Sequence, residues 1–576
     1  MTYIKPQDKI IKQKNMSSSS PTPNNNNEQQ QQQHDGPSLN YIKTRMEFMR
    51  ALKSTPSHPK LYELDYVQSM EVIGIWISFA TIAKLSYEKK IDDYLATYLN
   101  ATLALNAFIA LHSATHESMS QHNEEHLAFE GLVFRMAALV ANFDDGYKEN
   151  HKRHHNKTNS PTEDPDYAAA FATLAELGFA FNHGNSNPLT FAPRREEMGG
   201  NWNFETSRIA AMLMTKFAIS TPEYSKVGET LMKVWRQSNS ITSMLLYLFF
   251  ARYPHRKGYD PFTGKMRNEM DSFYENTYRG QGQVDLWMMG EGFHNAHHAK
   301  NDIPYTVLPR VGKEVEEMYP EIKQKSRGNF KILEMEKEAS NEGNDVFAPE
   351  LMNDGDREPM QFPYERTLKV RHGIDLLTTH QRPKEAIVTF ADAVITSALH
   401  VSGTADLSML RDLHQQMCKG VDPNTSKGVI PFHKWGETIF SDKNQQLLHK
   451  ESENIKAEIL KVAGQVGDKW IASNIAIKSK EDIKTNYLSF FKAIMLTFAS
   501  EDDYSKFFKA FASEKANILP RADPSYNGET LMEYLNSELP NELIPPANRD
   551  LGSMDKCVQT IANMIHPYVA ETKARL

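Results

Sequence analysis

The chain has 576 residues with 65 lysines and arginines against 73 aspartates and glutamates, and its formal net charge is −8. This length has room for several domains at roughly 100 to 200 residues each, and the lack of a dense basic block argues against a nucleic-acid partner. The two cysteines, Cys418 and Cys557, lie far apart. Their spacing excludes a disulfide framework and a cysteine-built zinc or iron–sulfur site.

The first part of the chain has the composition of a disordered tail. It begins MTYIKPQDKI, without the apolar core of a signal peptide, and residues 17–33 are serine, proline, threonine, asparagine, glutamate and glutamine only. A tract without apolar side chains cannot offset the entropy of ordering the chain. We therefore predict a disordered tail over 1–38, and a helix at about Lys43–Lys53 that lies along a surface.

Eight of the 21 histidines fall into three tight clusters. The clusters are His112 and His116, then His151, His154 and His155, then His294, His297 and His298. Histidines at positions i, i+3 and i+4 project from one face of a helix, so each cluster brings imidazoles together. A tetrahedral zinc takes three or four protein ligands, and eight ligands therefore indicate two metal ions. Imidazole suits iron, copper, zinc and nickel alike, so the ligand type does not name the metal.

The residues around these clusters resemble a known family. The boxes HSATHE from His112, HKRHHNKTNSPTEDPDY from His151 and GEGFHNAHH from Gly290 resemble the three histidine boxes of the membrane fatty-acid desaturase and hydroxylase superfamily. Order and intervals also fit, over about residues 65–325. The run DIPYTVLPRVGKEVEEMYPEI from Asp302 resembles sphingolipid-type desaturases, whereas HHxxTN and DPD in the second box resemble acyl-lipid desaturases or carotenoid ketolases. Because these two resemblances point to different subfamilies, they leave the substrate open.

The resemblance implies a diiron centre that uses O₂ as co-substrate and removes hydrogen from an unactivated C–H bond of a lipid chain. It implies that all eight clustered histidines are the metal ligands. It also implies a membrane-associated protein whose histidines face the cytoplasm, at the endoplasmic reticulum if the protein is eukaryotic. The chain contains no His-Pro-Gly-Gly signature of a fused cytochrome b5, so we expect a separate cytochrome b5-like or ferredoxin-like electron donor.

Many stearoyl-type members carry a further histidine ligand before the third box. The comparable stretch here is NTYRGQG from Asn276, with Gly280 at the position of that histidine. The ninth ligand is therefore missing or displaced; His183 or His255 could substitute, and Asn276 could hold a metal-bound water. Carboxylates that adjoin the boxes could orient the ring N–H groups, as such sites usually require. They are Glu117, Asp164, Asp166 and, foremost, Glu291.

The remaining histidines are interpreted as ordinary surface or core residues. His122 and His126 form another HxxxH, but they lie among Asn123, Glu124 and Glu125, on an expected solvated face. The others have no neighbour at ligand spacing and receive no role: His372, His380, His400, His414, His433, His449 and His566.

The apolar segments are short for a membrane family. A spanning helix needs about 20 mostly apolar residues, whereas the mean hydropathy of the chain is −0.56. The candidates are Val72–Ala83, Tyr94–Leu111, Ile209–Thr215 and Gln237–Ala251. They fit either short tilted segments that dip into a membrane or a helical core that is partly soluble, and the lipid substrate favours membrane association.

Beyond the boxes, a polar linker over 326–362 precedes a new periodic region. Helical periodicity marks four segments, Ile374–Val401, Glu451–Ala472, Lys484–Ser500 and Asp555–Lys573. Within the third, Phe490, Phe491, Ile494, Met495 and Phe498 form one stripe, which we interpret as a packing core. No motif assigns a function to this region.

These features predict an all-α fold. It comprises a helical desaturase-like domain over 39–325, with weak membrane-embedded helices and a cytosolic histidine-ligated dimetal cap, and a separate C-terminal helical domain over 363–576. The leading hypothesis is an oxygen-dependent diiron lipid desaturase acting on a fatty acyl or sphingolipid-type chain. The alternative within the superfamily is a lipid or carotenoid hydroxylase or ketolase. The alternative of another class is a catalytically silent metal-binding scaffold or interaction protein.

Overall fold

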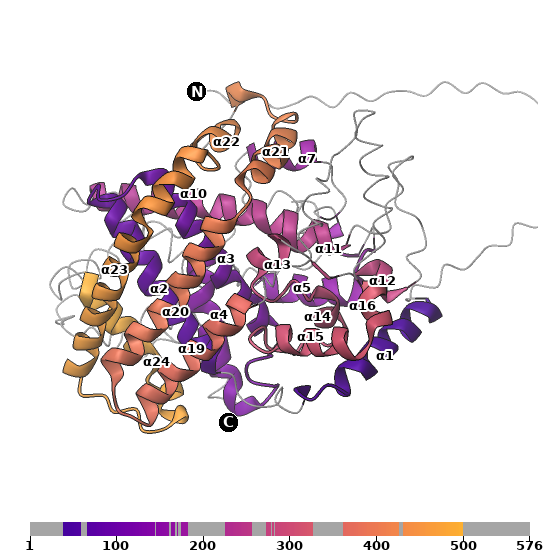
Figure 1. Ribbon diagram of the computed structural model, residues 1–576, viewed down its shortest axis with the longest axis horizontal. Coiled ribbons are helices and arrows are strands. Elements are labelled where there is room, and N and C mark those ends of the chain that lie inside the picture. Colours follow the sequence, from indigo (N-terminus) through magenta and orange to yellow (C-terminus); the bar gives the residue numbers. More distant parts are fainter. Residues whose placement is uncertain are drawn as a thin grey trace, which may run out of the picture. The chain divides into compact units, whose positions relative to one another are not determined.

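The fold is all-α, as predicted, throughout the described part of the chain (Figure 1). The computed structural model describes residues 38–58, 66–182, 225–255, 272–326 and 361–498, with short gaps at 144–145, 161–162, 168–169, 171–173, 278, 281–282 and 426–429. The tail at 1–37, the linker at 327–360 and the segments Ile209–Thr215 and Asp555–Lys573 lie outside the described residues.

The helices before residue 327 carry the histidine boxes. They are α1 (Leu39–Lys53), α2 (Tyr66–Tyr87), α3 (Asp93–Thr115), α4 (Glu124–Ala141), α5 (Gly146–Lys157), α7 (Leu174–Asn182), α10 (Ser225–Leu246), the π-helix η3 (Tyr247–Arg252), α11 (Tyr253–His255), α12 (Phe273–Asn276), α13 (Gln283–Met288), α14 (His294–Ala299), α15 (Leu308–Met318) and α16 (Pro320–Ser326). The predicted helix near Lys43 is α1, which begins where the Ser38 hydroxyl accepts a hydrogen bond from the Tyr41 amide at 3.0 Å.

The helices after residue 360 form a second series. They are α19 (Gln361–Thr378), α20 (Pro383–Thr404), α21 (Leu407–Cys418), the 3₁₀ turns η5 (Pro423–Thr425) and η6 (Phe432–Lys434), α22 (Trp435–Thr438), α23 (Asp442–Ala472) and α24 (Lys480–Phe498). The expected single segment Ile374–Val401 is therefore two helices. Pro383 disfavours helical conformation in the residue before it, and Gln381 turns the chain with a φ of 53°.

Among the described residues, three helices are long and apolar enough to cross a membrane: α2, α3 and α20. The predicted segments Val72–Ala83 and Tyr94–Leu111 lie inside α2 and α3. The third, α20, comes from the C-terminal region and packs directly against α2. At Gly74 an added Cβ would lie 2.5 Å from the Phe390 carbonyl oxygen, so only glycine allows this approach. The predicted segment Gln237–Ala251 is divided between α10 and the π-helix η3.

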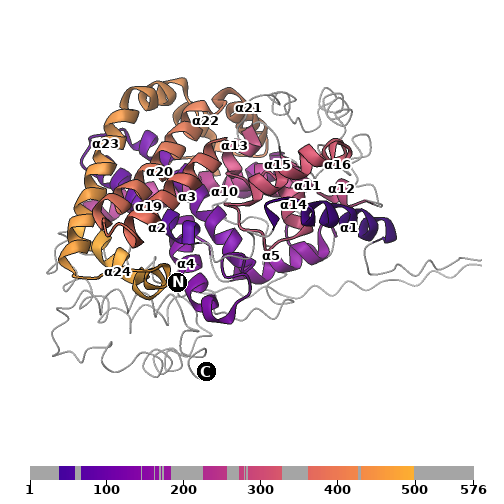
Figure 2. The ribbon, with the colours of Figure 1, turned by 60° about the horizontal axis from the view of Figure 1, so that its bottom comes forward.

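Helices α19, α20 and α23 run side by side in both views (Figures 1 and 2). The outer face of α23 is polar along its length, with Lys443, Lys450, Glu453, Lys461 and Lys469 exposed. Its inner face buries apolar residues such as Ile455, Ile459 and Val466. The side of α20 that faces α23 is thus covered by a helix whose outer surface suits water.

One continuous hydrophobic core contains side chains of α2 and α3 together with those of α19, α20, α23 and α24. The phenylalanine stripe of α24 belongs to it: Phe490, Phe491 and Ile494 are buried, which confirms the packing interpretation for these three. The helices on both sides of the linker therefore share one core in the described residues. The domain boundaries at 325 and 363 stay a prediction.

Candidate metal centre

Three short helical segments bring the eight clustered histidines together. His112 lies in the last turn of α3, and His116 is its C-cap. α5 carries His151, His154 and His155, and α14 carries His294, His297 and His298. Each of these eight side chains is at most 7 % exposed, so the site is closed to bulk water.

The rings form two groups. The first histidine group contains His112, His116, His151, His155 and His297, and the second histidine group contains His154, His255, His294 and His298. Within each group one ring nitrogen per histidine lies within 4.8 Å of all the others. The groups adjoin, since the ring centroids of His155 and His298 are 4.1 Å apart. The two adjoining groups are therefore compatible with two neighbouring metal ions, the number that the ligand count predicts.

In the first group the Nε2 atoms converge. The distance between Nε2 of His112 and Nε2 of His151 is 2.7 Å, that between His151 and His155 is 3.0 Å, and that between His155 and His297 is 3.0 Å. His116 Nε2 is buried without a hydrogen-bond partner among the described residues.

The second group shows the same convergence. Nε2 of His294 lies 2.8 Å from Nε2 of His255 and 3.1 Å from that of His298, and His298 Nε2 lies 3.3 Å from His154 Nε2. Metal–imidazole bonds are roughly 2.1 Å long, so two nitrogens at right angles around one ion lie about 3.0 Å apart and two at the tetrahedral angle about 3.4 Å. The Nε2 spacings quoted for both groups are thus close to those of nitrogens that share one metal ion.

His255 is the ninth histidine, and the sequence alone named it only as one of two possible substitutes. It follows α10 through the π-helix η3 and the single turn α11, and it is 1 % exposed. A π-helical turn is wider than an α-helical turn and is frequent at functional sites. The other possible substitute, His183, lies outside the described residues.

Gly280, at the position of the family's further histidine, has no room for a side chain. A Cβ there would lie 2.5 Å from Cγ1 of Val284, and the Gly280 amide donates to the Gly292 carbonyl at 2.6 Å. The ninth histidine of the two groups is thus His255, and position 280 contributes none.

The far nitrogens of several rings have partners that fix their orientation, as metal-binding imidazoles usually require. Asp164 accepts from His154 Nδ1 at 2.8 Å, and Glu291 Oε1 lies 3.2 Å from His112 Nδ1. Glu291 Oε2 lies 3.8 Å from His297 Nδ1, so this carboxylate lies beside two rings of the first group without a hydrogen bond to either. Asp166 stands further from His154 Nδ1, at 3.7 Å.

Asn276 and Glu117 differ from their predicted roles. The backbone carbonyl of Asn276 accepts from His255 Nδ1 at 3.0 Å, while its side chain bonds Asn159 and the Ser272 carbonyl. Asn276 thus orients a ring and does not offer a free amide to a metal-bound water. Glu117 contacts no clustered ring: it turns away with a φ of 57° and its carboxylate binds Lys148 and His122, each at 3.0 Å.

Burial sets the protonation of the rings, because desolvation disfavours the charged form. It lowers the pKa of His255 and His297 to about 3. It lowers the pKa well below the ordinary value for His116, His151, His155, His294 and His298. Burial also opposes protonation of His154, but Asp164 and Asp166 together outweigh it and raise the pKa of His154 to about 9. Neutral imidazole is the metal-binding form, so burial prepares most of the rings.

The loop of the third box depends on two glycines. Gly290 has a φ of +116°, which L side chains rarely adopt. At Gly292 a Cβ would lie 1.9 Å from Asp285 Oδ1. Asp285 in turn pairs with Arg279 at 2.8 Å, and Arg279 pairs with Glu316 at 2.8 Å. This buried network and the two glycines hold Glu291 beside the rings.

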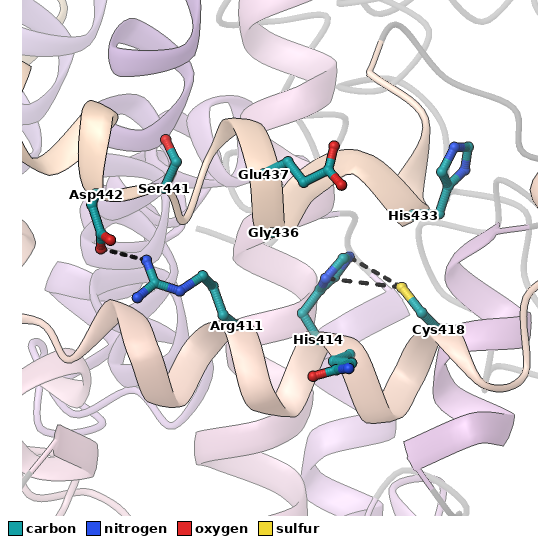
Figure 3. Close-up of a pocket in the computed structure, with 9 residues that line it drawn as sticks. Arg411, His414, Cys418, His433, Gly436, Glu437, Ser441 and Asp442 are labelled. Carbon is teal, nitrogen blue, oxygen red and sulfur yellow. Dashed lines mark hydrogen bonds and ion pairs between the residues drawn. The ribbon is translucent and has the colours of Figure 1, made fainter.

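A second, open hollow of about 570 Å³ lies between α21 and the segment that begins at His433 (Figure 3). His414 and Cys418 point toward each other there, with Sγ 3.5 Å from Nε2, but His414 Nε2 donates to the Phe432 carbonyl at 2.8 Å. Among the residues that the structure describes, only the two histidine groups bring three or more potential ligand atoms within 4.8 Å of one another. His414 and His433 stay without a metal-binding role, as do the exposed His122 and the half-buried His126.

Residues 94–327 match the family described as Fatty acid desaturase. The matched region begins inside α3, ends after α16 and contains all nine histidines. This region of the chain belongs to the membrane fatty-acid desaturase and hydroxylase superfamily, which confirms the resemblance of the three boxes. No curated protein and no solved structure matches the chain.

The family indicates a desaturase-type oxidoreductase with a lipid substrate. Together with the three long apolar helices it indicates association with a membrane. The two histidine groups are compatible with metal binding.

Proposed function

We propose that the chain is an oxygen-dependent diiron lipid desaturase that acts on a fatty acyl or sphingolipid-type chain. The observation that carries this proposal is the pair of adjoining, buried, all-histidine groups inside a region of desaturase family membership. Bound iron would supply O₂ activation and removal of hydrogen from an unactivated C–H bond. Imidazole suits iron, copper, zinc and nickel alike, so the family match is what supports iron over zinc.

In this proposal nine histidines hold the two ions. The eight clustered histidines and His255 divide into five ligands for one ion and four for the other. A six-coordinate ion would keep at least one position free in each group for O₂ or water. Asp164, Glu291 and the Asn276 carbonyl fix the orientation of the rings they contact.

Apolar side chains exclude water around the two groups. Phe250 of the π-helix packs edge-on against His112 of the first group and His294 of the second, with ring centroids 4.7 and 5.0 Å apart. Phe108 packs against both Phe250 and His112. A dry site strengthens electrostatic interactions and protects a reactive centre from side reactions.

We further propose that a separate cytochrome b5-like or ferredoxin-like protein delivers the electrons, and that the histidines face the cytoplasm, at the endoplasmic reticulum in a eukaryotic cell. The same first hydrogen abstraction would serve a lipid or carotenoid hydroxylase or ketolase. The likeness of the second box to carotenoid ketolases favours that alternative.

The test combines metal and lipid analysis. The purified full chain is expected to hold two irons, and cells that express it are expected to gain a lipid double bond. His297→Ala should abolish the new product, while His122→Ala, an exposed HxxxH histidine whose side chain is 56 % accessible, should keep it. A hydroxyl or keto product would favour the hydroxylase or ketolase alternative. Zinc alone, or no metal after gentle purification, would contradict the diiron proposal and favour the silent scaffold.

A further inference from the structure

Four polar side chains are buried together between α2, α3, α19 and the segment that follows the third histidine box. Glu71 of α2 is 1 % exposed, and Asn106 of α3, Tyr305 and Arg366 of α19 are no more than 4 % exposed. Glu71 and Asn106 lie in α2 and α3, two of the three described helices that are apolar enough to span a membrane. Ionisable side chains in such helices are costly and commonly serve a function.

Glu71 joins two separate segments of the chain. Arg366 Nε donates to Glu71 Oε1 at 2.8 Å, and a second Arg366 nitrogen donates to the Asn106 side-chain oxygen. The Tyr305 hydroxyl donates to the other carboxylate oxygen of Glu71. Each carboxylate oxygen thus has its own donor, one from the C-terminal region and one from the desaturase-like region.

This arrangement makes the partners interdependent. A carboxylate in an apolar interior is tolerated only when it is paired and hydrogen-bonded. Arg366 supplies the compensating charge, and it is the only one of the four residues that lies outside the stretch with desaturase resemblance. Without it, Glu71 would be driven to take up a proton or to leave its position, and Tyr305 would lose its fixed acceptor.

Tyr305 connects the network to the metal centre. Its carbonyl oxygen packs against Gly290, where an added Cβ would lie 3.2 Å from it, and its amide lies 3.5 Å from the Ser113 hydroxyl. Gly290 directly precedes Glu291, the carboxylate beside His112 and His297. Ser113 directly follows His112. Tyr305 therefore packs between two segments that present the first histidine group.

We propose that Arg366 is a positioning residue for the metal centre: through Glu71 it holds Tyr305, and through Tyr305 it holds the third-box loop that presents Glu291. This inference rests on the proposed metal-binding function. It assigns a role to α19, a helix outside the region that matches the desaturase family. The C-terminal region is then a working part of the enzyme and not an appended module.

The test is a Co²⁺ titration of the metal-free full chain, followed by the visible absorption of the bound ion, with thermal unfolding measured in parallel. Tyr305→Phe removes only the hydroxyl and is expected to weaken Co²⁺ binding about ten-fold, in the range for partners of metal ligands, with a smaller fall in unfolding temperature than Arg366→Met, because Glu71 keeps its charged partner. Arg366→Met is expected to lower both the Co²⁺ affinity and the unfolding temperature. Arg366→Lys, which keeps a charge beside Glu71, should recover part of the Co²⁺ affinity and part of the unfolding temperature.

A double variant separates positioning from stability. Glu71→Leu with Arg366→Leu removes both charges, which commonly restores the stability lost when only one partner is removed. We expect the double variant to regain its unfolding temperature but still to bind Co²⁺ weakly, because the Tyr305 hydroxyl has no acceptor. Lys384→Met, which breaks the exposed pair with Asp468 between α20 and α23 (2.7 Å), is the control and should bind Co²⁺ normally.

The outcomes distinguish failure of the positioning role of Arg366 from failure of the metal centre. If Tyr305→Phe and the double variant bind Co²⁺ as tightly as the unmodified chain, the positioning role is overturned while the metal centre stands. If the unmodified chain binds no Co²⁺, the metal centre fails, and the positioning role fails with it.

Discussion

At the scale of single residues, the strongest support for the site is the set of groups behind the imidazoles. Asp164 accepts from His154 Nδ1 at 2.8 Å and also from the amides of Asn159 and Asp166, at 2.7 and 2.8 Å. A carboxylate held by two backbone amides is itself fixed in place. It therefore fixes the ring that it contacts.

Asp164→Asn should weaken metal binding by about 10- to 100-fold, because the ring loses its charged partner. A titration with Fe²⁺ under anaerobic conditions measures the effect. Asp166→Asn is the matched control, since its carboxylate lies 3.7 Å from the same nitrogen, and a smaller loss is expected there. Equal losses in the two variants would show that only the local charge matters.

Glu130 of α4 gives a pH-dependent contribution to stability outside the metal centre. It is 1 % exposed and accepts from the amides of Met119 and Ser120 at 2.9 and 3.1 Å. Burial raises the pKa of Glu130 to about 7, against the lowering effect of these hydrogen bonds. A raised folded-state pKa stabilises the fold below the unfolded value of about 4.5, and this contribution is lost as the pH rises through 7.

For the metal-free chain, the free energy of unfolding should therefore fall by up to about 3 kcal/mol more between pH 4.5 and pH 8 than it does for Glu130→Gln. Denaturant unfolding of both proteins across this range measures the difference, in which the contributions of the other groups cancel. Parallel curves for the two proteins would contradict a raised pKa.

The eight clustered histidines were predictable because they repeat at helical ligand spacing, and the structure brings all eight together. His255 was not singled out, because it has no histidine neighbour and reaches the second group only through a π-helical turn. Glu117 shows the converse error: it directly follows His116 in the sequence, but a left-handed backbone conformation sends its side chain to Lys148 instead. Adjacency along the chain predicts little once a helix has ended.

At the scale of elements, the π-helix η3 decides where His255 points. Successive side chains in an α-helix are rotated by roughly 100° about the helix axis. The wider π-helical turn over Tyr247–Arg252 changes this rotation and so sets the direction in which His255 of α11 points.

Deletion of Tyr247, which would convert the π-helical turn to an α-helical one, should rotate His255 out of the second group. The expected result is one retained iron per chain, with loss from the second group, as in His255→Ala. Metal analysis of the purified protein measures how many irons each chain retains. Two retained irons in the deletion variant would show that another residue completes the second group.

The apolar segments show what hydrophobicity could and could not predict about the elements. Val72–Ala83 and Tyr94–Leu111 were identified by their lack of charge, and both lie within long helices. The helix α20 was placed in a separate domain, because periodicity cannot show what a helix packs against. Its contact with α2 at Gly74 depends on tertiary packing alone.

At the scale of the whole molecule, the family match ends at residue 327, while the hydrophobic core continues through α19, α20, α23 and α24. A chain of residues 38–326 alone would expose the faces of α2 and α3 that these helices cover. Large exposed apolar patches promote association.

We therefore expect the 38–326 fragment to aggregate or to retain far less iron than the full chain. Size-exclusion chromatography with metal analysis measures both properties. A monodisperse fragment with two irons would instead support the predicted boundary between two independent domains.

The division of the ligands among the helices has a consequence for how the centre is assembled. α5 and α14 each give rings to both histidine groups, so an ion held by the first group orders both helices, which carry three of the four histidines of the second group. Occupancy of one position lowers the entropic cost of filling the other. Metal uptake should be cooperative, with a Hill coefficient above one and few half-loaded chains at intermediate iron concentrations.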